Sequence, residues 1–414
     1  MKILHVVKTS SGARWAVEQC CILVQQGIEV HVAMPDDRGT SVPDWKKAGV
    51  ELHLLDCNLP VSAPQLLPER IKSIRNLVRN LNPHIIHSHF VSTTIMLRLA
   101  LGSGHPIPRV FQVPGPLHLE HALYRIAELK TAGKADYWIA SSRYTRNLYL
   151  KGGVPPDRLY LSYYGTDTKL LLGNDTLGSD NILLDEGSTA GSSRVVGNVS
   201  YMYPPKYFLG QTVGLKGHEN LIDALGIVCS ADPTIIGIVA GGQWGNGHTY
   251  ERRLRRRGRR VAGNKIRFTG RLVYSQVRAL WNNVDCAVHV PFSENCGGVV
   301  EPLLRSVPTI ASNVGGLPEL VIDGITGRLV TSRDPEILAE TILSVLYNLE
   351  EAKQQATIGS ILVSKMFDVN RTGMEVAAIY DHILGTGRQS PVSFDSEAFI
   401  RSLGYDMNGG KIKA

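Results

Sequence analysis

Short apolar runs alternate along the chain with longer segments in which apolar residues recur at helical spacing. The first run covers residues 2–7, and a helical pattern over 13–26 and a second run over 27–34 follow it. The same alternation starts again at residue 194. Buried strands that alternate with helices are typical of parallel sheets covered by helices on both faces. The pattern therefore predicts an α/β protein with two Rossmann-like halves.

A segment without periodicity separates the two halves. Residues 171–194 are rich in Gly, Ser, Asp and Asn, a composition typical of linkers. We expect an N-terminal domain over 1–180, a C-terminal domain over 193–365 and a frayed polar tail over 386–414. An insertion rich in aromatic residues, proline and glycine over 201–215 is expected to form a lid or docking loop.

The most informative stretch is residues 291–320, in which a glycine loop, a helix, a strand and a second glycine loop follow an apolar strand over 285–290. Its candidate ligand-binding residues are Glu294, Gly297, Gly298, Glu301, Gly315 and Gly316. Ligands of open α/β sheets bind at the carboxyl ends of the strands, where helix N-termini offer N–H groups to anions. Taken singly, each glutamate could instead be a helix cap or a favourable dipole contact.

This stretch resembles the C-terminal signature of the retaining, nucleotide-sugar-dependent glycosyltransferases of family 4. In that family two glutamates flank a glycine loop, and a Gly-Gly-x-Pro-Glu loop follows. Residues 293–301 (SENCGGVVE) place six residues between the glutamates, one fewer than the usual seven, and residues 311–319 (ASNVGGLPE) match the second loop. The resemblance implies the GT-B fold, with two Rossmann-like domains facing a cleft. It also implies that a helix over 366–385 crosses back to the first domain.

The resemblance further implies roles for particular residues. Glu301 would bind the ribose hydroxyls of the donor, and Glu294 the hydroxyls of the transferred sugar. Lys216, in a Lys-Gly pair before a helix, is expected to neutralise the diphosphate. Asn198 stands where the family has an arginine. The other expected donor-site residues are Gly12, Arg271, Asn295, Cys296, Gly297 and Gly298.

A histidine beside the transferred sugar is usual in the family, but Pro114-Gly115 occupies its place here. Either His118 takes the catalytic role from further along the loop, with His121 as a weaker candidate, or the role is vacant. Gly12 is the only glycine in the first strand-to-helix turn, so the dinucleotide fingerprint is missing and an NAD enzyme is disfavoured. Gly12 either approaches the donor or acceptor or is a plain turn glycine.

Metal and cofactor chemistry is not expected. His87 and His89 are predicted to point to opposite faces of a strand and to be structural, and no convincing Asp-x-Asp loop is present. The six cysteines lack the spacing of a zinc site or a disulfide framework and are expected to be reduced thiols. The expected partners are a nucleotide-diphosphate sugar, most simply a UDP-sugar, and a saccharide or lipid-linked acceptor.

The formal net charge of +7 suits anionic substrates, lipid surfaces or nucleic acid equally well. Seven arginines in residues 252–260 are interpreted as a solvated basic face, or else a contact with an acidic partner or lipid headgroups, because no aromatic residues are interleaved for nucleic acid. The cations of the helix expected over 66–81 are interpreted as a solvated face. Attraction of this helix to a membrane is the less favoured alternative. With no signal peptide or long apolar run, we expect a cytoplasmic protein, either free or peripheral at the inner membrane face.

A retaining glycosyltransferase of polysaccharide or glycolipid assembly is the favoured function. An inactive nucleotide-sugar-binding partner subunit would bind the donor without turnover. A nucleotide-sugar epimerase shares the fold class but needs acid/base carboxylates that are not evident in the N-terminal half. A nucleic-acid-binding protein depends on the arginine run alone. The sequence does not predict the oligomeric state.

Overall fold

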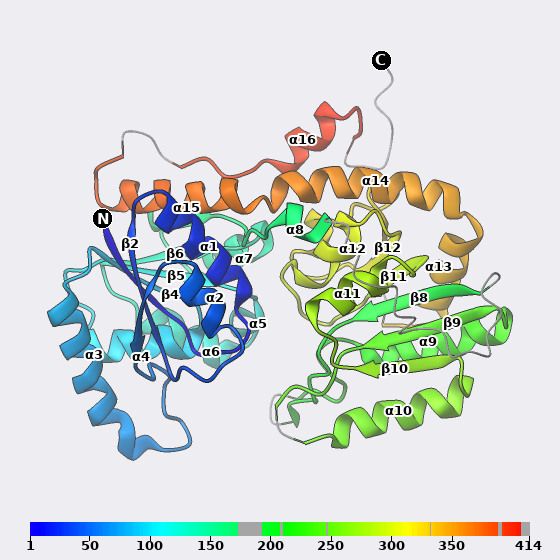
Figure 1. Cartoon of the computed structure of the whole chain (residues 1–414), viewed down its shortest axis with the longest axis horizontal. Coiled ribbons are helices and arrows are strands. Elements are labelled where there is room, and N and C mark those ends of the chain that lie inside the picture. Colours follow the sequence, from blue (N-terminus) through cyan, green and yellow to red (C-terminus); the bar gives the residue numbers. More distant parts are fainter. Residues whose placement is uncertain (173–192, 208–209, 246, 332, 388–390, 407–414) are drawn as a thin grey trace. The chain divides into compact units, whose positions relative to one another are not determined.

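The computed structural model describes residues 1–172, 193–207, 210–245, 247–331, 333–387 and 391–406. The chain divides into two compact units (Figure 1). Unit 1 contains residues 1–167 and 366–394, and unit 2 contains residues 168–365 and 395–414. Most of the predicted linker, 171–194, lies outside the described residues. No helix in the described ranges is long and apolar enough to cross a membrane.

Unit 1 is built on a seven-stranded parallel sheet with the order β3-β2-β1-β4-β5-β6-β7. Its strands are β1 (Lys2–Val6), β2 (Glu29–Met34), β3 (Glu51–Leu54), β4 (Ile85–Ser88), β5 (Arg109–Val113), β6 (Asp136–Ala140) and β7 (Leu159–Leu161). Successive residues of a strand face opposite sides of the sheet. Accordingly, Ile3 packs in the core on one face of the sheet, and Leu4 packs in the core on the other.

Helices cover both faces of this sheet. They are α1 (Arg14–Gln25), α2 (Val42–Lys47), α3 (Leu67–Leu81), α4 (Val91–Leu101), α5 (Leu117–Glu120), α6 (Ala122–Lys130), α7 (Arg143–Lys151) and α15 (Val369–Ile383). The core on the Ile3 face includes residues of α1 and α15, and the core on the Leu4 face includes residues of α3 and α4. Two cations of α3 are used internally, since Arg70 pairs with Asp56 and Arg75 donates to the carbonyl of Ala100.

Unit 2 contains a six-stranded parallel sheet with the order β10-β9-β8-β11-β12-β13. Its strands are β8 (Arg194–Val199), β9 (Ile235–Ala240), β10 (Ile266–Gly270), β11 (Cys286–His289), β12 (Thr309–Ser312) and β13 (Arg328–Val330). Its helices are α8 (Thr168–Leu172), α9 (His218–Ala231), α10 (Thr249–Ala262), α11 (Tyr274–Trp281), α12 (Val300–Leu304), α13 (Pro335–Tyr347), α14 (Leu349–Met366) and α16 (Ser396–Ser402). The prediction of two Rossmann-like domains is confirmed.

The strand order reverses at β1/β4 in unit 1 and at β8/β11 in unit 2. The loops after the two central strands run in opposite directions at such a point and leave a crevice beyond the carboxyl ends. Each unit therefore has one crevice where this topology favours ligand binding.

In unit 1, aromatic side chains from several elements gather at this reversal. The rings of His5, His87 and His89 are buried, and those of His87 and His89 stack with centroids 4.3 Å apart. Tyr380 of α15 hydrogen-bonds to His87. The prediction that His87 and His89 face opposite ways is wrong, because residues two apart in an extended chain share a face.

A buried network of charges joins α4, α6, β5 and β6. Asp136 accepts from Arg98 at 2.9 Å and from Arg109 at 2.6 Å, and Arg98 also pairs with Glu128 at 2.9 Å. The Arg98 and Asp136 side chains are each 1% exposed. Removing one member of a buried ion-pair network is costly because the remaining charge stays desolvated.

We therefore expect Asp136→Asn to lower the free energy of unfolding by about 3–5 kcal/mol, because two arginines lose their buried counter-charge. Urea denaturation followed by tryptophan fluorescence measures this change. The matched control is Asp323→Asn, whose carboxylate is 56% exposed and pairs with Arg328; it should cost less than about 1 kcal/mol. Equal effects of the two variants would contradict the assignment.

Candidate functional site

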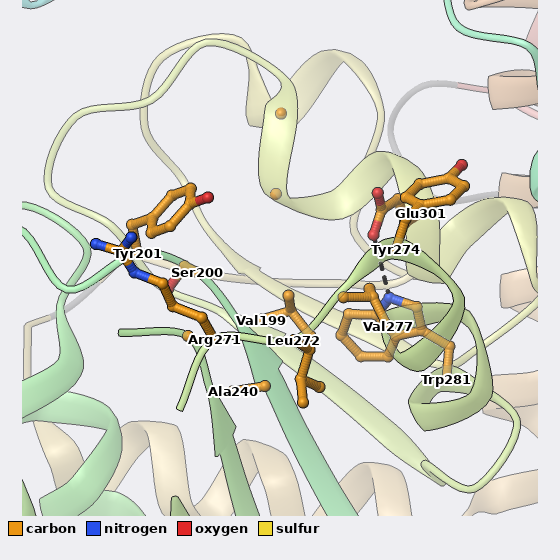
Figure 2. A pocket seen from close by; sticks show the side chains of 13 residues that line it. Val199, Ser200, Tyr201, Ala240, Arg271, Leu272, Tyr274, Val277, Trp281 and Glu301 are labelled. Carbon is orange, nitrogen blue, oxygen red and sulfur yellow. Dashed lines mark hydrogen bonds between the residues drawn. The ribbon is translucent and has the colours of Figure 1, made fainter. Parts of the chain in front are cut away.

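A pocket of about 360 Å³ opens at the carboxyl ends of β8, β9 and β10, beside the loop after β11 (Figure 2). This is the reversal point of the unit 2 sheet, where ligand binding is expected. Its lining residues are Val199, Ser200, Tyr201, Ala240, Gly241, Arg271, Leu272, Tyr274, Val277, Trp281, Gly297, Gly298 and Glu301. Its volume is within the range of small-molecule sites, about 300–1,000 Å³.

The pocket has two polar sides with apolar residues between them. Figure 2 shows Tyr201 and Arg271 at one side and Glu301 at the other. The Glu301 carboxylate accepts a hydrogen bond from the indole N–H of Trp281, at 3.4 Å. Arg271 donates to the carbonyl of Gln243 at 2.7 Å. The two polar groups are thus held by neighbours of the same unit, as expected of a preformed site.

Glu294 lies in the loop after β11 and is 12% exposed. It accepts hydrogen bonds from Lys216 and from His289 Nε2, the latter at 3.0 Å. Burial alone would raise the pKa of Glu294, but the charge of Lys216 and the hydrogen bond with His289 outweigh it and hold the pKa well below its usual range. Burial lowers the pKa of His289, so the ring is neutral. The site therefore has a carboxylate that stays ionised at neutral pH.

Three glycines are required by the packing around this carboxylate. A Cβ at Gly298 would lie 2.2 Å from the His289 ring, and a Cβ at Gly315 would lie 1.7 Å from the Glu294 carbonyl oxygen. Gly217, next to Lys216, has φ +69°, and a Cβ there would lie 2.0 Å from the Val290 carbonyl oxygen. The glycine loops thus allow the backbone to close around Glu294 and Lys216.

The insertion 201–215 begins beside the pocket, although residues 208–209 of it lie outside the described part. Met202 pairs with the loop after β9, and Tyr203 stacks on Trp244 with centroids 5.6 Å apart. Lys216 lies 6.0 Å from the centre of the Tyr203 ring. This start of the insertion therefore forms a wall of the site.

Most of the residues predicted for donor binding gather in this region of unit 2. Arg271, Gly297, Gly298 and Glu301 line the pocket, and Asn295 and Cys296 lie in the same loop as Glu294. Cys296 is buried, and burial raises the pKa of its thiol, which is therefore neutral. Asn198 is not among the lining residues. Its buried side chain donates to the Val288 carbonyl at 2.8 Å and thereby joins β8 to β11.

Two predicted residues belong to unit 1. His118 is 6% exposed, and its Nε2 lies 3.2 Å from the Tyr149 hydroxyl. Burial lowers the pKa of His118 to about 4, so the ring is neutral. Gly12 has φ +77°, a turn conformation that favours glycine, and nothing lies within 4 Å of a Cβ built on it. Its carbonyl accepts from the Ser41 hydroxyl at 2.8 Å.

Several site residues were not predicted. Tyr201, Tyr274 and Trp281 line the pocket, and His289 orients Glu294. His289 could have been noticed as a polar residue at the end of an apolar strand. The aromatic residues had no comparable signal, because Tyr201 lies far along the chain from Tyr274 and Trp281 of α11.

The fold and the site together define an α/β protein of two Rossmann-like domains with a polar pocket at the strand reversal of the second. The family model Glycosyltransferase Family 4 matches residues 12–170, and the model Glycosyl transferases group 1 matches residues 205–359. The chain belongs to the group 1 glycosyltransferases with the GT-B fold.

Among curated proteins, the D-inositol 3-phosphate glycosyltransferase of Corynebacterium glutamicum is 25% identical over 62% of this chain and 60% of its own length. An uncharacterised glycosyltransferase of Methanocaldococcus jannaschii is 34% identical over 28% of this chain and 34% of its own length. The matches thus span less than two thirds of these relatives. The crystal structure of Anabaena Alr3699/HepE in complex with UDP and glucose has a TM-score of 0.74 and 21% identity, covering 92% of this chain and 99% of that chain.

Proposed function

We propose that the protein is a retaining glycosyltransferase that moves a sugar from a nucleotide diphosphate, expected to be UDP, to a saccharide or lipid-linked acceptor. The observation that carries this proposal is the pocket with Glu301 at its wall, next to an ionised Glu294 paired with Lys216. The two family models and the UDP complex of the similar Anabaena structure support it. Polysaccharide or glycolipid assembly is the setting we infer.

In this proposal the nucleoside occupies the pocket. The Glu301 carboxylate, oriented by Trp281, accepts hydrogen bonds from the ribose hydroxyls. Charged acceptors make stronger hydrogen bonds than neutral ones. The base lies among the apolar and aromatic lining residues, near Tyr201 and Arg271.

The diphosphate of the donor extends from the pocket toward Gly297, Gly298 and Lys216 in this proposal. Departure of the nucleotide diphosphate builds negative charge on the leaving oxygen, and a preorganised cation stabilises that charge. Lys216 is 16% exposed, so its charge acts with little screening by water. Its present partner is Glu294, and the phosphate would share or replace that contact.

Glu294 has a role that its protonation state restricts. Because its pKa lies well below the usual range, it cannot serve as a proton donor at neutral pH. As an anion it accepts hydrogen bonds from the sugar hydroxyls and stabilises positive charge on the anomeric carbon. His289 fixes the carboxylate in place by donating from Nε2. For His118 we propose a contact with the sugar and no proton transfer, because burial lowers the pKa of its ring.

No metal is required in this proposal. Among the described residues, the two clusters of side chains that could hold a metal ion are His5–His87–His89 and His31–Glu51–His53, both in unit 1. Lys216 supplies the positive charge that a metal would otherwise bring to the diphosphate. Both family models describe glycosyltransferases, which favours transfer over epimerisation.

The first prediction concerns the donor pocket. UDP should raise the melting temperature more than GDP or ADP, equally with magnesium and with a chelator. Glu301→Gln should weaken UDP binding by about tenfold, because a charged hydrogen-bond acceptor is lost. Lys216→Ala should weaken UDP binding but leave uridine binding unchanged.

Glu340→Gln, on the exposed surface of α13, is the matched control and should bind UDP like the wild type. Absence of stabilisation by all three nucleotides would contradict the donor-site assignment. That result would favour the alternative that the protein binds nucleic acid.

The second prediction concerns chemistry. Glu294→Gln should reduce acceptor-independent hydrolysis of the UDP-sugar by at least about 100-fold, because the anion opposite the anomeric carbon is lost. UDP affinity and the circular dichroism spectrum should be retained. Hydrolysis at the wild-type rate would remove Glu294 from the mechanism. If the wild-type protein binds UDP-sugars without turning any over, even with acceptors added, the inactive-partner alternative is favoured.

We also propose that α10 contacts an anionic lipid surface. Three of its arginines form ion pairs: Arg253 with Glu219, Arg255 with Glu251 and Arg257 with Asp223. Four others are exposed and have no ion-pair partner in the described part of the chain: Arg252, Arg256, Arg259 and Arg260. Their spacing places them on one helix face.

One exposed aromatic ring contacts an arginine of α10. Tyr207 is 66% exposed and accepts from Arg253 at 3.3 Å. Basic residues attract anionic headgroups, and Trp and Tyr favour the membrane interface. A lipid-linked acceptor would be reached from such a surface.

The third prediction tests this surface by sedimentation with vesicles. The protein should bind vesicles of phosphatidylcholine with 30% phosphatidylglycerol but not pure phosphatidylcholine. Changing Arg252, Arg256 and Arg259 to Glu should weaken binding at least about tenfold. Changing the exposed Lys46, Lys47 and Lys72 to Glu makes the same charge change elsewhere and should leave binding intact. Equal loss in both variants, or tight binding to nucleic acid instead, would contradict the proposal.

A further inference from the structure

A second cluster of titratable side chains lies on the edge of the unit 1 sheet, on β2 and β3. Each strand carries a Glu-x-His sequence, Glu29-Val30-His31 and Glu51-Leu52-His53. The strands pair in parallel with His31 opposite Glu51 and Ala33 opposite His53. Because alternate residues share a face, the two glutamates and two histidines lie together on one side of the sheet.

The contacts within this cluster fit the ligand shell of a metal ion. His31 Nδ1 lies 3.0 Å from His53 Nε2 and 3.5 Å from a Glu51 carboxylate oxygen. His53 Nε2 lies 3.9 Å from the other Glu51 oxygen. Ligand atoms about 2.0–2.1 Å from a tetrahedral zinc ion are roughly 3.3 Å apart. The three side chains therefore surround a position of suitable size without rearrangement of the backbone.

Glu29 contacts the His31 ring at Nε2, the nitrogen that does not face His53 and Glu51. It accepts from His31 Nε2 at 2.9 Å, and Lys2 Nζ lies 3.2 Å from the same carboxylate oxygen. With its Nε2 proton directed at Glu29, His31 has its free lone pair on Nδ1, which faces His53 and Glu51. A carboxylate that orients a ligating histidine in this way is a recurrent feature of metal sites.

We propose that His31, His53 and Glu51 form a binding site for a divalent transition-metal ion of the zinc type, with Glu29 orienting His31. The ion would replace the single proton shared between His31 Nδ1 and His53 Nε2, and water would complete its coordination. Two imidazoles and a carboxylate are ligands that suit zinc. The ion would join the edge strand β3 to β2 and stabilise unit 1.

The cluster of His5, His87 and His89 is a weaker candidate. The Tyr164 hydroxyl donates to the Gln112 carbonyl at 2.8 Å, so it accepts from His89 Nδ1 at 3.0 Å. His89 Nε2 is then the acceptor for His5 Nδ1, at 2.9 Å. This chain of hydrogen bonds uses the ring nitrogens that a metal would need. The edge cluster is also accessible, since Glu51 is 67% and His53 22% exposed.

The test uses the whole chain, stripped with a chelator and titrated with Zn²⁺ in competition with a chromogenic chelator. One equivalent of Zn²⁺ should bind and raise the melting temperature. His53→Ala and Glu51→Gln should each weaken Zn²⁺ binding at least about tenfold and abolish the stabilisation, and Glu29→Gln should weaken binding by roughly tenfold.

The matched control is His248→Ala, since His248 is also an exposed histidine near a carboxylate, 3.9 Å from Glu251. This variant should bind Zn²⁺ like the wild type. With Co²⁺ in place of Zn²⁺, the wild type should show the visible absorption of a tetrahedral site and His53→Ala should not. Failure of the wild type to bind one equivalent, or undiminished binding by His53→Ala, would overturn the proposal. Neither readout depends on transferase activity.

Discussion

The arrangement of the candidate site depends on the pairing of Glu294 with Lys216. Both side chains are largely removed from water, and each would be costly to bury alone. Together with the neutral His289 they form a stable unit that fixes a negative and a positive charge at the carboxyl end of β11. The loops must approach closely for this pairing, which is why Gly217, Gly298 and Gly315 cannot carry a side chain. Charge placement and glycine positions are thus consequences of one constraint.

The two units use the same topology in different ways. Both sheets reverse strand order at their centre, and both crevices lie beyond the carboxyl ends of the strands. In unit 2 the crevice is a pocket lined by apolar and aromatic residues, with Arg271 and Glu301 on its polar sides. In unit 1 the rings of His5, His87 and Tyr380 meet at the equivalent place, where the Tyr380 hydroxyl hydrogen-bonds to both histidines. The side chains, rather than the fold, therefore decide what each reversal point can bind.

Local patterns predicted most of the fold and the core of the site. Buried strands and glycine loops are encoded over short segments, so spacing and composition predicted them, and the Glu294–Glu301 pair was singled out by its resemblance to a family signature. Features that depend on pairing between distant segments were missed. The Glu-x-His sequences of β2 and β3 meet only because of their parallel register, and Trp281 of α11 hydrogen-bonds to Glu301 of α12, 20 residues further along the chain. Asn198 was assigned by its place in a motif, but its amide is used to bond β8 to β11.

The arginines of α10 show why composition could not identify a partner. A count of charges treats all seven alike, yet the structure divides them into two groups. Arg253, Arg255 and Arg257 neutralise carboxylates on α9 and α10 and so contribute to packing within unit 2. The arginines on the exposed face add to the potential that an approaching surface would experience. The charge available to a partner is therefore smaller than the sequence suggests, and it is confined to one face of one helix.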